Sequence, residues 1–89
     1  YLLITKKNNK FTSYVGYTID LDKRLKLHNQ GKGAKFTKGF EWEVIYQKTY
    51  NTKSKALTEE YKLKNDKKKR NLIKFEYIKK NENFDSVTI

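Results

Sequence analysis

Two short runs of apolar, aromatic and β-branched residues at the start of the chain constrain its fold most strongly. The runs are Tyr1–Thr5 and Phe11–Tyr17, and the polar segment Lys6–Lys10 between them contains two Asn residues. Each run has the composition of a β-strand, and an Asn-containing turn between two strands is typical of a hairpin. The sequence therefore predicts that the chain begins with a β-hairpin.

The middle of the chain predicts a helix, a basic loop and a third strand. Asp20 is a typical N-cap residue, and the apolar residues of Leu21–Gln30 recur with helical spacing. Gly31 is a typical C-terminal stop, and it opens a loop with the sequence GKGAKFTKG that ends at Gly39. Trp42–Tyr50 roughly alternates apolar and polar residues, which predicts a strand.

The last part of the chain predicts two helices and a tail. Thr52 or Ser54 can cap a helix that runs to about Asn65, and a further helix is expected over Lys67–Lys80. The tail, residues 81–89, is expected to be partly extended. The order β-β-α-β-α-α indicates an α+β fold, a small three-stranded and mainly antiparallel sheet flanked by helices.

Length and composition limit the size and location of the protein. A chain of 89 residues allows one domain, which we place at residues 1–80. It begins without Met inside an apolar run, so we expect further residues to precede it. No apolar run is long enough to span a membrane and no signal-peptide pattern is present. We therefore expect an intracellular, cytoplasmic and nucleoid-associated protein.

The charge balance indicates a polyanionic partner. The chain has 21 Lys and Arg residues against 10 Asp and Glu residues, a formal net charge of +11. Nucleic acid and membrane surfaces both attract such a chain. Basic helices that bind membranes carry a broad apolar face, which the basic stretches here lack. Nucleic acid is thus favoured and no membrane partner is expected.

The first predicted helix places a cation beside the single His of the chain. Arg24 and His28 are one turn apart, on the side of the helix that also carries Leu21 and Leu25. Arg24 is one of only two Arg residues in a Lys-rich chain, and its planar guanidinium can bind phosphate with two parallel hydrogen bonds. A phosphate-binding pair is one interpretation, and side chains that extend to water beside an apolar stripe are the other.

The second predicted helix carries a carboxylate on its apolar side. Glu60 projects between the apolar residues of this helix, whereas Glu59 falls on the polar side. A buried carboxylate needs a cation, either a metal ion or an ion pair with Arg24 or Lys64. Periodicity alone does not single out Glu60, because Glu76 holds a comparable place in the third helix.

The residue inventory narrows the metal to a hard cation. The chain has no Cys and one His, which excludes thiolate sites and disfavours structural zinc. A single carboxylate suits Mg²⁺, which keeps several waters and binds substrate phosphate.

Two other groups of residues are candidates for contact with a substrate. Tyr14 and Tyr17 are expected to share one face of the second strand, with Gly16 leaving room on the other face. The basic loop carries Lys residues that either hold phosphates or remain a solvated surface; it lacks the G-K-[ST] ending of a P-loop. Its Lys residues are Lys32, Lys35 and Lys38.

Together these motifs resemble the GIY-YIG endonuclease superfamily. Tyr1-Leu2-Leu3 stands where the first motif has its Tyr, although the preceding Gly and Ile are not in the chain, and Tyr14-Val15-Gly16 is similar to the second motif. Asp20–Gly39 resembles small stand-alone bacterial members and the catalytic subunits of structure-specific junction endonucleases. Ser54–Lys64 is similar to the helix that bears the metal-binding Glu. The resemblance covers roughly Tyr1–Ile73.

The resemblance implies a role for each matching residue. Glu60 would hold one divalent ion, Mg²⁺ or Mn²⁺, and Arg24 would contact the scissile phosphate. Tyr1 or Tyr14 would accept the proton of the attacking water, while the other orients it, and His28 would donate a hydrogen bond or relay the proton. The residues implied to bind nucleic acid are Tyr17, Lys32, Lys35, Lys38 and Lys64.

The resemblance implies metal-dependent hydrolysis of DNA, branched or duplex, selected by structure rather than by sequence. We expect a monomer, and a protein partner that supplies specificity is compatible with so small a domain. Two alternatives remain: a module on the same fold that binds nucleic acid without cutting it, and a basic ribosome-associated structural protein.

Overall fold

The computed structural model describes residues 1–7 and 10–85, and the order of its elements is β-β-α-β-α-α. The elements are β1 (Leu2–Lys7), β2 (Lys10–Val15), α1 (Leu21–Asn29), β3 (Glu43–Tyr46), α2 (Lys53–Asn65) and α3 (Lys67–Asp85). The predicted α+β fold with a three-stranded antiparallel sheet is confirmed. Two residues of the predicted turn, Asn8 and Asn9, lie outside the described residues.

The sheet has the strand order β2-β1-β3, and β1 is antiparallel to both neighbours. The hairpin ladder runs from Leu2 opposite Val15 to Lys7 opposite Lys10. The third strand is shorter than predicted and ends at Tyr46 rather than Tyr50. Tyr46 pairs with Leu2, the first residue of β1, so no strand continues alongside to bond the residues beyond it.

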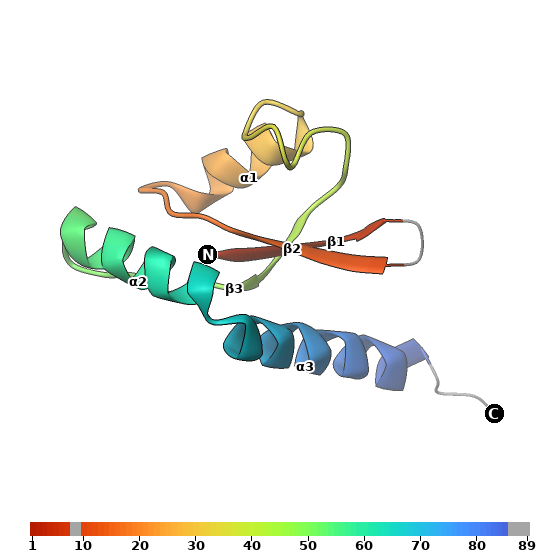
Figure 1. Ribbon diagram of the computed structural model, residues 1–89. Helices are drawn as coiled ribbons and strands as arrows, with labels where there is room; N and C mark the ends of the chain where they lie inside the picture. Colours follow the sequence, from red (N-terminus) through yellow and green to blue (C-terminus); the bar gives the residue numbers. More distant parts are fainter. Residues whose placement is uncertain (8–9, 86–89) are drawn as a thin grey trace.

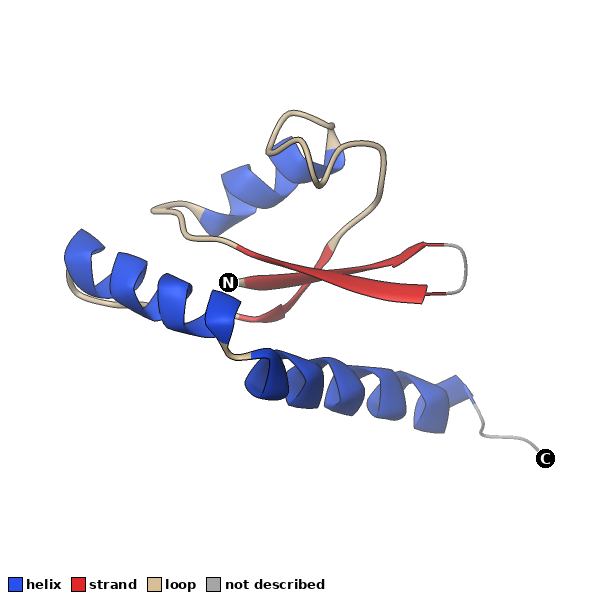
Figure 2. Ribbon diagram, in the orientation of Figure 1, coloured by secondary structure: helices blue, strands red, loops and turns tan. Residues whose placement is uncertain are grey.

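The helices cover the two faces of the sheet, with α1 on one face and α2 and α3 on the other (Figures 1 and 2). Residues directly opposite each other in an antiparallel pair project to the same face. Leu2 and Val15 form a pair, and both pack with Leu63 of α2 in the hydrophobic core. Leu3 and Tyr14 form the next pair and therefore face α1. The strand alternation thus places Tyr14 on the α1 side of the sheet.

The long connection from α1 to β3 is anchored by hydrogen bonds. The Asn29 side chain receives a hydrogen bond from Trp42 N at 2.6 Å and donates to Trp42 O at 3.3 Å. The Trp42 indole N–H donates to Thr37 O at 2.9 Å, and both side chains are buried. These contacts fold the basic loop back against the end of α1.

The helix boundaries follow local signals with one exception. Asp20 caps α1 and Thr52 caps α2, as predicted, each side chain accepting from the backbone N–H three residues on. The prediction of a tail from residue 81 is wrong up to Asp85, because α3 continues to that residue. No Pro or Gly occurs in this segment to stop the helix, and residues 86–89 lie outside the described part. Among the described residues, no helix is long and apolar enough to cross a membrane.

Candidate active site

Tyr1 immediately precedes the central strand β1 and lies opposite Gly16. The backbone N of Tyr1 donates to Gly16 O at 2.8 Å, and Gly16 N donates to Tyr1 O at 3.1 Å. The Tyr1 ring lies directly over Gly16, since a Cβ at that position would come within 2.5 Å of the ring carbon Cζ. Any larger residue would displace the phenol, so Gly16 is needed to hold Tyr1 in place.

The phenol of Tyr1 is hydrogen-bonded to His28 of α1, which is 1% exposed. Tyr1 Oη lies 2.8 Å from His28 Nε2, and His28 Nδ1 lies 2.8 Å from Thr37 Oγ1. The Thr37 hydroxyl donates its single proton to Ala34 O at 3.1 Å, so it can only accept from the imidazole. This network assigns the proton of neutral His28 to Nδ1 and leaves Nε2 to accept from Tyr1.

A second glycine, Gly33, packs closely against the imidazole. A Cβ at Gly33 would lie within 2.7 Å of His28 Cγ. Gly33 belongs to the basic loop, the same loop that supplies Thr37. The chain from α1 to β3 therefore fixes the His28 ring by a hydrogen bond to Nδ1 and by close packing of backbone against the ring.

The protonation of both groups is shifted by the surroundings. Burial lowers the pKa of His28 below its ordinary value, and the positive charge of Arg24 lowers it further. Burial raises the pKa of Tyr1 to about 12; the negative charges of Tyr14 and Glu60 add to the rise, and Arg24 opposes it. Tyr1 is thus a phenol and His28 a neutral imidazole near pH 7.

Arg24 lies one helical turn before His28 and is partly buried. Its guanidinium makes no ion pair or hydrogen bond with the residues whose side chains are described, 1–6 and 10–80, although its charge acts on both His28 and Tyr1. A partly buried cation without an anionic partner, next to a Tyr–His pair, is suited to bind an anion such as a phosphate.

Glu60 belongs to α2, which lies on the opposite face of the sheet from α1 (Figure 1). Its side chain is 14% exposed and its charge raises the pKa of Tyr1. Of the two ion pairs considered for Glu60, the one with Lys64 is present, with Nζ and Oε1 3.3 Å apart, and the one with Arg24 is not found among the described residues. The Lys64 side chain is 52% exposed, so water can replace this contact readily.

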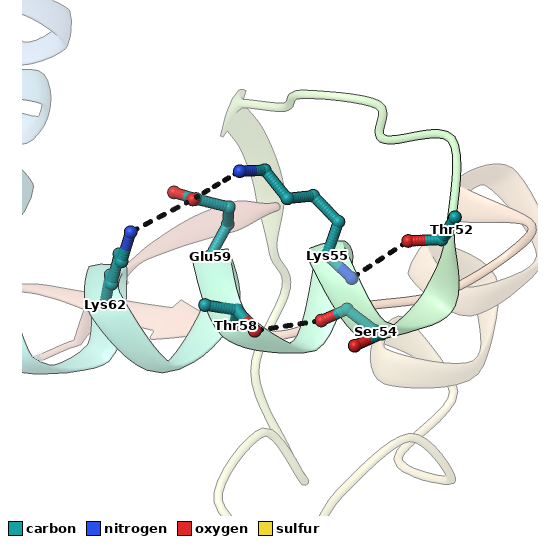
Figure 3. Close-up of polar contacts among 6 residues, drawn as sticks. All are labelled: Thr52, Ser54, Lys55, Thr58, Glu59 and Lys62. Carbon is teal, nitrogen blue, oxygen red and sulfur yellow. Dashed lines mark hydrogen bonds and ion pairs between the residues drawn. The ribbon is translucent and has the colours of Figure 1, made fainter.

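The neighbouring Glu59 forms ion pairs with two lysines, Lys55 and Lys62 (Figure 3). Its carboxylate lies 3.7 Å from Lys55 Nζ and 3.4 Å from Lys62 Nζ. Burial raises the pKa of the Glu59 carboxyl, but the hydrogen bond from Lys62 and the nearby Lys charges lower it by more, so this pKa lies below its ordinary value. The third candidate, Glu76, is exposed on α3 and does not line the groove described next.

An open groove of about 550 Å³ runs between the end of the β-hairpin, the connection from β3 to α2, and α2 itself. Tyr1, Tyr17 and Glu60 line it, whereas Tyr14 and Arg24 do not. The expectation that Tyr14 and Tyr17 share one face is wrong. The strand ends at Val15, so Tyr17 is outside its alternation and turns toward the groove while Tyr14 packs against α1.

The residues around Glu60 fit only one kind of metal site. Within the part of the chain that the structure describes, no group of three or more His, Asp or Glu residues lies together. An all-protein metal cage is therefore not formed there. Glu59, Glu60 and Asp66 all line the open groove. Glu59 is paired with two lysines, whereas Glu60 is paired with one exposed lysine. Glu60 therefore suits an ion that takes its other ligands from water and substrate oxygens, as Mg²⁺ does.

Some of the predicted site residues are brought together, and others are dispersed. The phenol of Tyr1 is hydrogen-bonded to His28, and the charges of Arg24 and Glu60 act on it. The lysines predicted to bind nucleic acid, all exposed, lie in the basic loop or on α2: Lys32, Lys35, Lys38 and Lys64. Sequence reasoning missed Thr37 and Gly33, because nothing in a Thr or Gly of a polar loop indicates that the loop folds onto a histidine.

The sequence of this chain matches a nuclease domain of a known class. The family model described as the GIY-YIG catalytic domain matches residues 1–83, and the chain belongs to this family. The resemblance predicted from the motifs is therefore confirmed. A GIY-YIG domain is a nuclease domain, which implies DNA as the substrate and, as these enzymes generally use them, divalent metal ions.

Relatives with similar sequences occur in bacteria. A UPF0213 protein of Staphylococcus epidermidis is 49% identical over 59 residues, which are 65% of this chain and 72% of that protein. UPF0213 protein YazA of Bacillus subtilis is 43% identical over 65 residues, 72% of this chain and 64% of YazA. A UPF0213 protein of Oceanobacillus iheyensis is 50% identical over 52 residues, 57% of this chain and 60% of that protein. The match thus spans less than two thirds of the latter two relatives. No solved structure matches this chain.

Proposed function

We propose that this protein is a metal-dependent endonuclease that hydrolyses DNA phosphodiester bonds and selects its substrate by structure rather than sequence. The observation that carries the proposal is the series of hydrogen bonds from Tyr1 through His28 to Thr37. The charge of Arg24 acts on this series, and its guanidinium forms no ion pair with the side chains that the structure describes. A buried neutral imidazole that accepts a hydrogen bond from a phenol is positioned to accept the proton of that phenol.

In this proposal Tyr1 passes a proton rather than releasing it beforehand. As water attacks the phosphorus, its proton moves to Tyr1 Oη while the phenol proton moves to His28 Nε2. The phenolate never accumulates, which agrees with the raised pKa of Tyr1. Of the two candidates for the proton acceptor, Tyr1 and Tyr14, we favour Tyr1 because it alone lines the groove and hydrogen-bonds His28.

The remaining site residues stabilise charge and hold the substrate. The Arg24 guanidinium would bind the scissile phosphate and the negative charge that develops on it. Glu60 would hold one divalent ion, Mg²⁺ or Mn²⁺, which supplies Lewis-acid stabilisation of the phosphate and the leaving oxygen. Tyr17 and the exposed lysines of the basic loop would contact the DNA backbone without reading its sequence.

A matched pair of variants tests the proposal. Glu60→Gln removes the carboxylate charge and is expected to lower Mg²⁺-dependent cleavage of labelled DNA by at least about a hundredfold. Glu59→Gln removes a charge at the adjacent position, where the carboxylate already serves Lys55 and Lys62, and should stay within a few-fold of wild type. Equal residual cleavage in the two variants would contradict the assignment of Glu60.

A binding module that does not cut DNA is the second candidate. The ion pair between Glu60 and Lys64 favours it, because a carboxylate that keeps a lysine partner does not need a metal. The two candidates differ in the wild-type protein: the nuclease converts a labelled DNA to shorter products when Mg²⁺ or Mn²⁺ is added, and the binding module leaves it intact while still shifting it in a binding assay.

A further inference from the structure

Phe36 is a large apolar residue that the basic loop exposes instead of burying. Its side chain is 58% exposed. Its ring is stacked on Tyr14, with centroids 6.0 Å apart and an angle of 21° between the planes, and is tilted against buried Trp42 at 6.2 Å. One side of the ring is therefore fixed by aromatic neighbours, and the large exposed fraction leaves ring surface open to solvent.

The next residue along the loop fixes the position of this ring relative to the candidate active site. Thr37 is fully buried and bonds His28 Nδ1, while Phe36 points outward. The ring of Tyr14 contacts both residues, since its centroid lies 6.0 Å from that of Phe36 and 5.1 Å from that of His28. Phe36 is thus separated from the Tyr1–His28 pair by a single aromatic ring.

The charge around Phe36 is entirely positive along the chain. The flanking residues Lys35 and Lys38 are exposed, and no Asp or Glu occurs between Asp22 and Glu41. An exposed aromatic ring bordered by lysines combines the two elements that bind single-stranded nucleic acid, a surface on which bases stack and a positive field for phosphates.

We infer that Phe36 stacks on an unpaired base next to the scissile phosphate, so that the preferred substrate is DNA with unpaired nucleotides beside the cut. In a continuous duplex each base is stacked between its neighbours, so none is free to stack on Phe36. In a flap, a gap or an open branch point a base is free, and it gains the ring as a partner. The inference rests on the proposed function for the cut itself, but the binding preference can be measured without cleavage.

The test measures affinity for DNA in the Glu60→Gln background without metal, using fluorescence anisotropy on a flap substrate and on a plain duplex of equal length. Phe36→Leu keeps an apolar cover over Tyr14 and loses the ring, and we expect it to bind the flap about tenfold more weakly and the duplex unchanged. Phe36→Trp should retain flap affinity. The matched control is Phe75→Leu, at another exposed phenylalanine on α3, 62% exposed, which should change neither affinity.

The outcomes separate this inference from the proposed function. Equal flap affinity for Phe36→Leu and the parent, or equal losses on flap and duplex, would overturn the stacking role while leaving nuclease activity untouched. Failure of the parent to bind any DNA would overturn both. Should Phe36→Leu not fold, wild-type protein can be crosslinked to a flap that carries 5-iododeoxyuridine at the unpaired position. Stacking predicts that the crosslink maps to Phe36, and a crosslink elsewhere contradicts it.

Discussion

The phenol oxygen of Tyr1 and the Nε2 atom of His28 lie 2.8 Å apart, although 27 residues separate them in the chain. Tyr1 immediately precedes the central strand β1, and His28 is buried in α1. Glycines make the approach possible on both sides, Gly16 beneath the phenol and Gly33 against the imidazole. The pair is therefore built by the packing of α1 and its following loop onto the sheet.

Replacement of Arg24 by Lys tests whether the geometry of the guanidinium matters. Lys keeps the charge but offers no planar pair of donors to a phosphate. We expect kcat for DNA cleavage to fall about a hundredfold, in the range seen when one transition-state hydrogen-bond donor is removed. Lys23→Ala removes an exposed cation from the adjacent position of α1 and serves as the control, with an effect of only a few-fold. Similar losses in the two variants would indicate a general effect of charge.

Replacement of Gly33 by Ala tests the support of the imidazole. The new Cβ would lie within 2.7 Å of His28 Cγ, so the ring must move and its hydrogen bonds to Tyr1 and Thr37 must lengthen. We expect cleavage to fall at least about tenfold in a protein that still folds. Gly39→Ala is the control: it meets no atom within 4 Å, but its φ of 89° strains an alanine. It should lower the melting temperature and leave the rate per folded molecule near that of wild type.

Thr37 is expected to act as a positioning residue through His28. Thr37→Val keeps the shape of the side chain and leaves the buried Nδ1–H without its acceptor, at a cost of about 1–3 kcal/mol in the free energy of unfolding. The other tautomer then becomes competitive, and it cannot accept a proton from Tyr1. We expect kcat to fall at least about tenfold with KM nearly unchanged. Thr37→Ser retains the hydroxyl and should restore most of the rate; a normal kcat in the Val variant would refute the role.

The dependence of stability on pH follows from the lowered pKa of His28. In the unfolded chain the histidine binds a proton near pH 6.5, whereas in the folded protein burial and Arg24 oppose protonation. Below pH 6.5 the unfolded state therefore binds more protons, and the free energy of unfolding falls as the pH decreases, by up to about 1.4 kcal/mol per pH unit. The fall levels off below the pKa of the folded state.

Urea denaturation at several pH values between 5 and 8 measures this effect. His28→Gln lacks the titrating group, so its free energy of unfolding should lose this part of the pH dependence, while carboxylates contribute equally to both proteins. Parallel curves for the two proteins would show that His28 titrates normally in the folded state. The same titration should appear in cleavage, whose rate is expected to decline as the neutral imidazole is protonated at acidic pH.

The sequence by itself determined the elements whose signals are local. The β-hairpin, the Asp20 cap of α1 and the bounds of α2 follow from residues close together in the chain, and the structure has them nearly as predicted. The motifs around Tyr1, Tyr14 and Glu60 were also enough to indicate the GIY-YIG family, which the match over residues 1–83 confirms.

Only the tertiary structure decided which of several equivalent residues meet. Periodicity left Glu60 and Glu76 alike, but α2 lies beside the start of β1 and α3 extends away from it (Figure 1), so Glu60 shares the groove with Tyr1 and Glu76 does not. Thr37 reaches His28 because its loop folds back onto α1. The physical reason is that spacing along a chain fixes the direction of a side chain relative to its own helix or strand, whereas its partner is set by how the elements pack.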